Sequence, residues 1–355
     1  CRCVMVILLP TVVLVGGVRG LVRVKPLHQK SGLDQRDRKT GLMFIARIGL
    51  FMIDYDKVFI TGGNGLVGSC VTGKHRPSSK EVNLLNYDET LSYMQENKIE
   101  YVVHCAARVG GVKENMEKLG EFFYENMLMT LNIIEASRVC GVKKMVCLQS
   151  TCIFPDNATY PLTTDQIYKG EPHPSNYGYG YAKRMTEINA RAYRDQYGMN
   201  IVNVIPCNVY GIGDNYNLES SHVIPGLIHK CHLAKQNNTN FEVWGDGLAQ
   251  REFLYNKDLG KIIDWMLLEY DSPESLIVSP DMEHAIVEAV VLITKAFDFC
   301  GSVEYDSSKP KGQHRKPSDN SKFKELRPDF NFTPLNIGIK ETVDWFNANY
   351  KKVRK

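Results

Sequence analysis

A tyrosine and a lysine at helical spacing form the clearest pair of chemical groups in the sequence. Tyr179 and Lys183 lie four residues apart in the segment YGYGYAK, and residues at i and i+4 share one face of an α-helix. A free tyrosine has a pKa of about 10 and is a poor proton shuttle at neutral pH, whereas a nearby ammonium favours the phenolate and lowers that pKa. The spacing therefore predicts a proton-transfer pair for work on a carbonyl group.

A hydroxyl and a thiol follow one another where an apolar run ends. The run at 144–151 ends in Ser150 and Thr151, and Cys152 comes directly after them. A hydroxyl there could hydrogen-bond a substrate carbonyl beside Tyr179, and a thiolate could remove a proton from the carbon next to a ketone. An isolated cysteine is more often a small buried apolar residue, so both interpretations of Cys152 stand.

A histidine at the start of a predicted helix is a candidate acid. His222 stands in the segment SHVIP, directly before a helix expected near 223–235. An imidazole, with an ordinary pKa of about 6.5, can supply a proton near neutral pH. The alternative interpretation is an ordinary surface or capping histidine.

A glycine-rich loop follows the first predicted strand. Gly62, Gly65 and Gly68 give the spacing GxxGxxG directly after the apolar run 57–61. Such glycines allow a tight strand-to-helix turn and close approach of the backbone to a pyrophosphate, so the loop predicts dinucleotide binding. A plain glycine turn is the alternative. The candidate binding residues are Gly62, Gly63, Asn64, Gly65, Leu66, Val67 and Gly68.

Alternating strands and helices are predicted to position these groups. Continuous apolar runs, typical of buried parallel strands, lie at 57–61, 101–107, 144–151 and 200–206. Helices are expected at 88–98, with Asp88 as the cap, at 120–141, ending at Gly141, and at 179–197. This alternation indicates parallel βαβ units. Further helices are expected near 223–235, 257–270, 283–298 and 336–350, and short strands near 241–245 and 276–279.

The predicted fold class is α/β, a Rossmann-type doubly wound parallel sheet with a smaller mixed α/β C-terminal substrate lobe. We expect the dinucleotide-binding domain at 52–206, shortened at 69–83, and the substrate-binding lobe at 207–355, with some strands returning to the main sheet. Residues 1–51 are expected to be an N-terminal extension, either disordered or an artefact of gene assembly. Its apolar run at 4–18 is shorter than the roughly 20 residues of a membrane span, and a secretory signal or anchor is the alternative.

Composition restricts the classes of partner. Of the 355 residues 43% are hydrophobic and the formal net charge is +3, which indicates neither nucleic acid nor membrane as a partner. The ten cysteines form no CxxC pair, so we expect reduced thiols in a cytoplasmic protein. His229, Cys231 and His232 do not share one helix face, and we predict no metal site.

The order of these motifs resembles that of a known enzyme superfamily. A glycine loop after the first strand, a strand ending in serine and a Tyr-x-x-x-Lys helix are the organisation of the short-chain dehydrogenase/reductases. Within that superfamily the chain resembles the GDP-L-fucose synthase family, over roughly residues 57–355. The resemblance is carried by ITGGNGLVGS, AARVGGV, STCIFP, NYGYGYAKRM, IPCNVYGIGDNYN, SHVIPGLIHK, VWGDGLAQREFLY and PDFNFTPL.

The resemblance implies a reaction in two stages at one site. GDP-4-keto-6-deoxy-D-mannose would first be epimerised at carbons 3 and 5, and its 4-keto group would then be reduced by NADPH to give GDP-L-fucose. Cys152 and His222 would be the base and acid of the epimerisation, and Tyr179 the proton donor of the reduction. Lys183 would hold the cofactor and Ser150 the keto oxygen.

The resemblance also implies binding residues and a partner. NADP(H) is the implied cofactor, and its site would include, besides the glycine loop, Lys183, His222, Pro206, Cys207, Asn208 and Val209. The GDP part of the substrate would meet Lys230, Trp244 and Arg251, since cations suit a diphosphate and indole offers an apolar face. Family members pair as homodimers through two long helices per subunit, here 120–140 and 179–197.

The chain departs from the family between Gly68 and Leu84. About a dozen residues are missing for the helix and second strand that a complete βαβ unit needs, and Gly73 and Pro77 interrupt any helix there. Lys311 stands where the family usually has an aspartate that contacts substrate. Two alternatives stay open: another nucleotide-sugar epimerase or dehydratase of the same superfamily, and a catalytically impaired cofactor-binding isoform.

Overall fold

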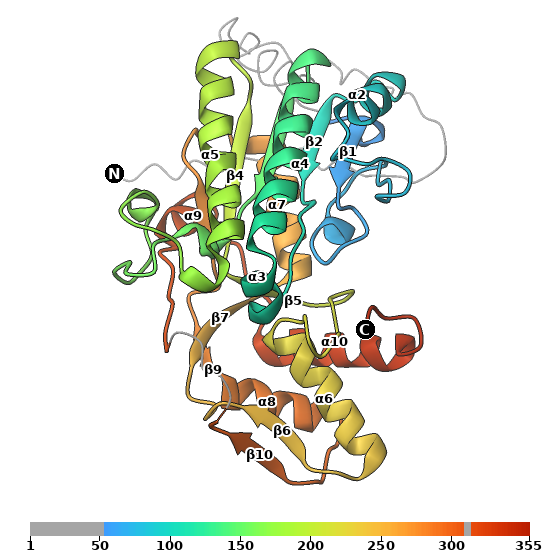
Figure 1. Ribbon diagram of the computed structural model, residues 1–355, viewed down its shortest axis with the longest axis vertical. Coiled ribbons are helices and arrows are strands. Elements are labelled where there is room, and N and C mark those ends of the chain that lie inside the picture. Colours follow the sequence, from blue (N-terminus) through green and yellow to red (C-terminus); the bar gives the residue numbers. More distant parts are fainter. Residues whose placement is uncertain (1–52, 309–313) are drawn as a thin grey trace, which may run out of the picture. The chain divides into compact units, whose positions relative to one another are not determined.

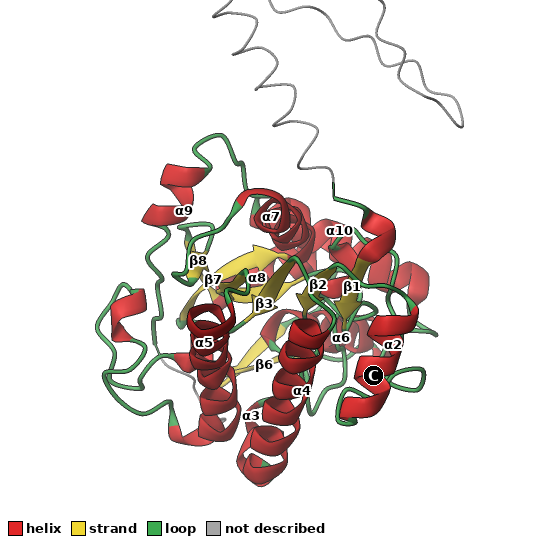
Figure 2. Ribbon diagram, turned by 90° about the horizontal axis from the view of Figure 1, so that it is seen from above, coloured by secondary structure: helices red, strands yellow, loops and turns green. Residues whose placement is uncertain are grey.

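A parallel sheet forms the centre of the computed structural model, which describes residues 53–308 and 314–355. The predicted Rossmann-type α/β fold is confirmed (Figure 1), and β8, from the C-terminal half of the chain, occupies one edge of the sheet (Figure 2). The apolar run 4–18 and Lys311 lie outside the described residues. The strands are β1 (Val58–Thr61), β2 (Tyr101–His104), β3 (Lys144–Leu148), β4 (Ile201–Pro206) and β8 (Leu276–Val278), paired in the order β1-β2-β3-β4-β8.

Helices cover both faces of this sheet, because successive strand residues point to opposite sides. Val58 and Ile60 pack in one apolar cluster with α7 (Asn256–Glu269), whereas Phe59, between them, packs on the other face. That second face carries α2 (Tyr87–Glu96), α4 (Leu119–Val139) and α5 (Tyr177–Tyr197). The helices α4 and α5 run side by side (Figures 1 and 2).

Two predicted helix boundaries need correction. The cap of α2 is Asn86, not Asp88, because the Asn86 side chain accepts hydrogen bonds from the backbone N–H of Asp88 at 3.0 Å and of Glu89 at 3.2 Å. The helix expected from residue 283 begins three residues later, since Glu283–Ala285 forms strand β9 before α8 (Ile286–Ala296). The end of α4 agrees with the prediction: Gly141 adopts φ +66° just after it.

The segment after the glycine loop is as short as the sequence predicted. A single 3₁₀ turn, η2 (Gly68–Cys70), stands where a complete βαβ unit has a helix. In place of a second strand, the chain makes one parallel bridge between Phe59 and His75 at the edge of β1. The chain then continues into α2, so the connection from β1 to β2 contains α2 but no α-helix directly after the glycine loop.

The C-terminal lobe has a core of its own, formed by α6 (Val223–Asn237), α8 and α10 (Leu335–Asn349) against short strands. The sequence pattern missed several elements because they are too short to show periodicity. They are β5 (Asn208–Tyr210), β7 (Gln250–Tyr255), β9, β10 (Val303–Asp306), α3 (Val112–Glu117) and α9 (Ser321–Leu326). β5, β7 and β9 form one sheet, and β10 pairs with β6 (Phe241–Trp244). Within the two described ranges no helix has the length and apolarity to cross a membrane.

Candidate active site

The glycine loop turns tightly at the carboxyl end of β1. Gly62 adopts φ +64°, and a side chain there would place its Cβ 2.9 Å from the Cα of Ala106. A Cβ on Gly68 would lie 2.4 Å from the carbonyl oxygen of Gly62, and the N–H of Gly65 donates to that same oxygen at 2.9 Å. The turn itself therefore needs glycine at positions 62 and 68, and the carboxyl end of a parallel sheet is where dinucleotides bind.

The other loop residues tie this turn to the fold beneath it. Val67 is buried in the core, and the carbonyl oxygen of Leu66 accepts a hydrogen bond from the Asn256 side chain at 2.9 Å. Asn64 is exposed at the tip of the loop. Gly63 has backbone on one side and the side chain of Arg76 on the other, so a Cβ there would lie 2.8 Å from the Arg76 Cβ.

Ser150 joins the cysteine and the tyrosine of the candidate site. It follows β3 and caps the 3₁₀ turn η3 (Thr151–Ile153), so that its hydroxyl oxygen accepts the backbone N–H of Cys152 at 3.2 Å. The same hydroxyl hydrogen-bonds Tyr179, the third residue of α5. The tertiary structure therefore brings Ser150, Cys152 and Tyr179 to one place at the carboxyl end of the sheet.

The expected lowering of the tyrosine pKa is not found. Burial raises the pKa of Tyr179 well above its ordinary value, the neighbouring Cys152 raises it further, and the hydrogen bond with Ser150 lowers it only in part. The Lys183 ammonium is not among the groups that shift this pKa, and its Nζ donates to the carbonyl oxygen of Leu148 at 3.0 Å. Tyr179 therefore holds its proton and is suited to donate it.

Lys183 is deeply buried, with 3% of its surface exposed. Burial lowers the pKa of its ammonium to about 8, although Cys105 and Cys147 act in the opposite direction. Burying a cation among apolar groups costs free energy. The presence of a buried lysine at the carboxyl end of β3 therefore indicates a binding or catalytic role.

Cys152 is half-buried and lies among polar groups. The side-chain amide of Asn176 donates to its Sγ at 3.2 Å, and the ammonium of Lys316 is near enough to respond to its charge. The thiol therefore lies beside a hydrogen-bond donor and a cation at the carboxyl end of the sheet.

His222 stands at the N-terminus of α6 with its side chain exposed. The pKa of the imidazole is lowered, chiefly because surrounding residues displace water from the ring. The positive charge of Arg354 lowers it further. Among the described residues no hydrogen bond or ion pair joins His222 to Cys152. The structure therefore does not bring this predicted acid into contact with the predicted base.

The segment Pro206–Val209 runs from the carboxyl end of β4 into β5. Cys207 is buried, and burial raises the pKa of its thiol well above the ordinary range. Asn208 donates from its side chain to the carbonyl oxygen of Glu252 at 3.0 Å, which ties the segment to β7. These contacts hold the backbone of the segment in place.

The predicted GDP-binding residues lie in the C-terminal lobe. The Lys230 ammonium, from α6, stands 4.3 Å from the centre of the Trp244 ring, on β6. Arg251, on β7, donates to the carbonyl oxygen of Gln250 at 2.6 Å, and its pKa is lowered by burial. Two cations and an indole therefore project from neighbouring elements of one lobe.

Sequence reasoning missed Lys316 and the residue that holds its segment. The charges of Cys152 and Arg251 both affect the pKa of Lys316, so Lys316 is near the predicted base and near one of the predicted GDP-binding residues. Its neighbour Ser318 donates its backbone N–H to the buried Glu252 carboxylate at 3.1 Å. No motif marks Lys316, because more than 150 residues separate it from Cys152 along the chain.

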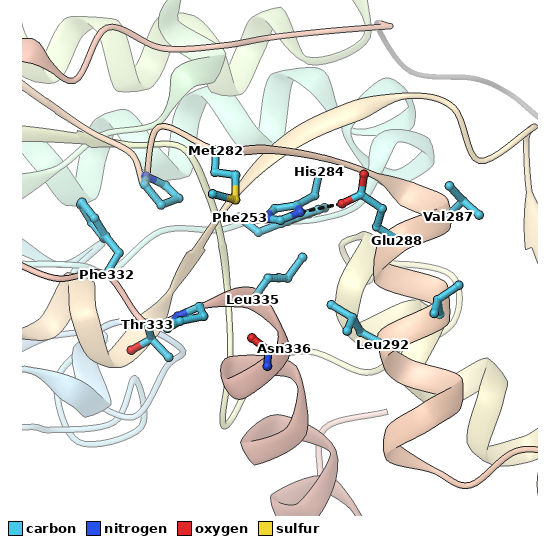
Figure 3. Close-up of a pocket in the computed structure, with 13 residues that line it drawn as sticks. Phe253, Met282, His284, Val287, Glu288, Leu292, Phe332, Thr333, Leu335 and Asn336 are labelled. Atoms are coloured by element: carbon cyan, nitrogen blue, oxygen red, sulfur yellow. Dashed lines mark hydrogen bonds and ion pairs between the residues drawn. The ribbon is translucent and has the colours of Figure 1, made fainter.

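A pocket of about 530 Å³ lies elsewhere, between β9, α8 and the start of α10 (Figure 3). His284 pairs with Glu288 at 2.8 Å on its wall. The wall is mostly apolar and contains none of the predicted site residues, so this pocket is not the candidate active site. Its lining includes Phe253, Met282, Val287, Phe332 and Leu335.

The residues present fit a dinucleotide at two of its parts. The glycine turn leaves no room for side chains where a pyrophosphate would approach, and the buried Lys183 offers a cation at the catalytic end. The adenosine side is less complete, since one bridge replaces the second strand. In residues 53–308 and 314–355 no three His, Cys, Asp or Glu side chains are grouped so as to hold a metal ion.

Comparisons with known proteins agree on one family. Residues 58–278 match the NAD dependent epimerase/dehydratase family. The chain is 42% identical to a GDP-L-fucose synthase of Dictyostelium discoideum, over 84% of this chain and 97% of that protein. It is 39% identical to a probable GDP-L-fucose synthase of Drosophila melanogaster, over 84% and 99%. The structure of a GDP-L-fucose synthetase from Naegleria fowleri bound to NADP matches with a TM-score of 0.82 and 38% identity, over 86% of this chain and 96% of that one.

Proposed function

Because this chain belongs to the NAD dependent epimerase/dehydratase family, we propose that it converts GDP-4-keto-6-deoxy-D-mannose to GDP-L-fucose with NADPH. The observation that carries this proposal is the contact of Ser150 with both Cys152 and Tyr179. A simple reductase needs the tyrosine and the serine, whereas a thiol at the same place adds a base for epimerisation.

The epimerisation uses the thiol and the imidazole. Cys152, as thiolate, removes a proton from the carbon next to the 4-keto group, and the charge moves onto the keto oxygen as an enolate. Ser150 and Tyr179 can hydrogen-bond that oxygen. His222 then delivers a proton to the opposite face of the carbon, so that the configuration inverts. This mechanism requires the sugar ring to bind between Cys152 and His222.

The reduction uses the tyrosine. The glycine loop and Lys183 would hold NADPH, which would supply the hydride for carbon 4 when bound. Tyr179 gives its proton to the keto oxygen, and its raised pKa keeps the phenol protonated until the keto oxygen accepts that proton. Lys183 positions the cofactor through the same ammonium that donates to Leu148.

Cations of the C-terminal lobe hold the nucleotide part of the substrate. We assign the diphosphate to Arg251 and Lys230, and we add Lys316, which lies close to both Arg251 and Cys152. Trp244 supplies an apolar face for packing. A diphosphate bound there would place the sugar toward Cys152.

We also propose a homodimer in the cytoplasm. Along α4 and α5, which lie side by side, several large apolar side chains are exposed: Phe123, Tyr124, Leu131, Val139, Tyr177, Ile188 and Tyr197. A second copy of this helix pair would complete a four-helix bundle and cover them. The cytoplasm suits a mechanism that needs Cys152 as a reduced thiol.

The test is a reaction of the full chain with GDP-4-keto-6-deoxy-D-mannose and NADPH in heavy water. We expect loss of nicotinamide absorbance, GDP-L-fucose as product, and deuterium at carbons 3 and 5. Tyr179→Phe should still exchange these protons but should oxidise NADPH more slowly, by about 10²-fold or more. A folded chain that oxidises no NADPH, exchanges no proton and binds no NADP⁺ would refute the proposal and favour the impaired isoform.

A further inference from the structure

The shortened segment after the glycine loop leaves two carbonyl groups without their helical donors. In a helix the carbonyl of Gly68 would accept the N–H of Thr72, and that of Val71 would accept the N–H of His75. Here the N–H of Thr72 donates to a carboxylate of α7 at 2.8 Å, and the N–H of His75 donates to a carbonyl of β1 at 3.1 Å. The carbonyl of Gly68 keeps one backbone donor, the N–H of Val71 at 3.3 Å, whereas the carbonyl of Val71 accepts no backbone N–H in the described part of the chain. Backbone carbonyls inside a fold need a donor, so the Val71 carbonyl needs one from a side chain.

Arg76 supplies these donors from one side chain. Its Nη1 donates to the carbonyl oxygen of Gly68 at 2.5 Å and to that of Gly63 at 3.3 Å. Its Nη2 donates to the carbonyl oxygen of Val71, and its Nε to that of Gly73 at 3.1 Å. The planar guanidinium is thus surrounded by the backbone of the loop and of the turn that follows it.

The contact between loop and arginine runs in both directions. The side-chain amide of Asn64, at the tip of the loop, donates to the carbonyl oxygen of Arg76 at 3.4 Å. Gly63 packs so closely on Arg76 that no side chain fits between them. The conformation of the predicted phosphate loop therefore depends on Arg76 at several points.

Arg76 also supplies charge that the fold otherwise lacks. A helix N-terminus contributes about half a positive charge to a phosphate site. The three-residue turn η2 is too short to do so. The hydrogen bonds of Arg76 in the described part of the chain go to carbonyl oxygens. Burial raises the pKa of the Asp264 carboxylate, which accepts from Thr72, and the nearby charge of Arg76 lowers it in part, so Asp264 offsets part of that charge without a hydrogen bond to the guanidinium.

We propose that Arg76 is the positioning residue of the dinucleotide-binding loop, replacing with its N–H groups and its charge the helix that this chain lacks. The inference rests on the proposed binding of NADP(H), and it assigns the affinity for the dinucleotide pyrophosphate to this one side chain. Relatives with a complete helix would not need an arginine in this place.

The test compares the full chain with Arg76→Met, which keeps the length of the side chain but removes charge and donors. Arg191→Met, at a half-exposed arginine on α5, is the matched control. We expect Arg76→Met to weaken NADP⁺ binding at least about tenfold by calorimetry, since several hydrogen bonds and a charge are lost. Amide hydrogen exchange in the free protein should rise within residues 62–73 and stay unchanged in β3 and β4. The control should match the original chain in both measurements.

An unchanged dissociation constant for NADP⁺ in Arg76→Met would overturn the inference, whatever the exchange shows. If this variant does not fold, Arg76→Lys provides the test instead. A lysine keeps the charge but not the planar fork of donors, so we expect faster amide hydrogen exchange in the loop and weaker NADP⁺ binding. Binding and exchange equal to those of the original chain would refute the need for the guanidinium. Absence of NADP⁺ binding by the original chain would instead refute the proposed function.

Discussion

Burial controls proton affinity at the candidate site more strongly than neighbouring charges do. The i,i+4 spacing of Tyr179 and Lys183 is real, yet the tyrosine pKa is raised rather than lowered, because burial is the largest effect. Burial also lowers the lysine pKa. In solution the lysine pKa is slightly higher than the tyrosine pKa, and in the folded chain this order is reversed. The spacing in the sequence therefore shows which side chains share a helix face, but not how strongly each one binds its proton.

Lys183 should make stability depend on pH. Its folded-state pKa of about 8 lies below the ordinary 10.5, so the unfolded chain binds this proton more tightly between these pH values. The free energy of unfolding therefore increases as the pH rises through this window. The contribution of Lys183 to this increase is up to about 3 kcal/mol, since each unit of pKa shift corresponds to about 1.36 kcal/mol. We expect the stability of the original chain relative to Lys183→Met to increase between pH 8 and 10.5, as measured by urea unfolding. If the difference in stability between the two chains does not change with pH, the lowered pKa of Lys183 is wrong.

Cys152 should be needed for proton exchange but not for cofactor binding. We expect Cys152→Ala to slow deuterium incorporation into the substrate by about 10²-fold or more, because no other thiol contacts Ser150 among the described residues. Binding of NADP⁺ by calorimetry should be unchanged. The exposed Cys300 is the control, and Cys300→Ala should exchange at the original rate. Normal exchange in Cys152→Ala would assign the base to another residue.

At the scale of elements, the glycine loop keeps its turn although the following helix is missing. The turn depends on close local backbone contacts at Gly62 and Gly68. It also depends on Arg76, which follows the turn in the chain and hydrogen-bonds its backbone. A loop built in this way is sensitive to side chains at the glycines.

Gly68→Ala should open the loop. Its Cβ would lie 2.4 Å from the carbonyl oxygen of Gly62, so the backbone must shift. We expect a loss of about 1–3 kcal/mol in the free energy of unfolding and at least about tenfold weaker NADP⁺ binding. Gly120→Ala, on α4, is the control, since a Cβ there meets no atom within 4 Å. It should stabilise the chain by about 0.5–1 kcal/mol. Equal effects of the two substitutions would contradict this account.

At the scale of the whole molecule, the exposed apolar side chains of α4 and α5 predict the surface of association. Leu131, on α4, is 43% exposed, and a charge there would be buried without a partner in a four-helix bundle. We expect Leu131→Lys to weaken the dimer at least about tenfold, as measured by light scattering after gel filtration over a range of concentrations.

Ile337→Lys, on α10, is the matched control for this surface. Ile337 is 46% exposed and lies on another helix, so the same substitution should leave the molecular mass unchanged. A monomeric original chain, or a dimer that tolerates Leu131→Lys, would exclude the α4–α5 surface as the site of pairing.

The sequence by itself determined the central sheet and the types of chemical group. Continuous apolar runs predicted β1 to β4, and the glycine spacing predicted the turn after β1, because both patterns follow from local packing and backbone freedom. The Tyr179–Lys183 spacing and the deficit between Gly68 and Leu84 were also visible along the chain.

Only the tertiary structure decided which distant residues meet. Lys316 comes close to Cys152, β8 joins β4, and Ser150 bonds Tyr179 through contacts that no local period encodes. Arg76 holds the shortened turn to the glycine loop because its fork of donors faces the backbone carbonyls of Gly63, Gly68 and Val71. Proton affinities belong to this second group as well, since they depend on how completely the folded chain excludes water from each side chain.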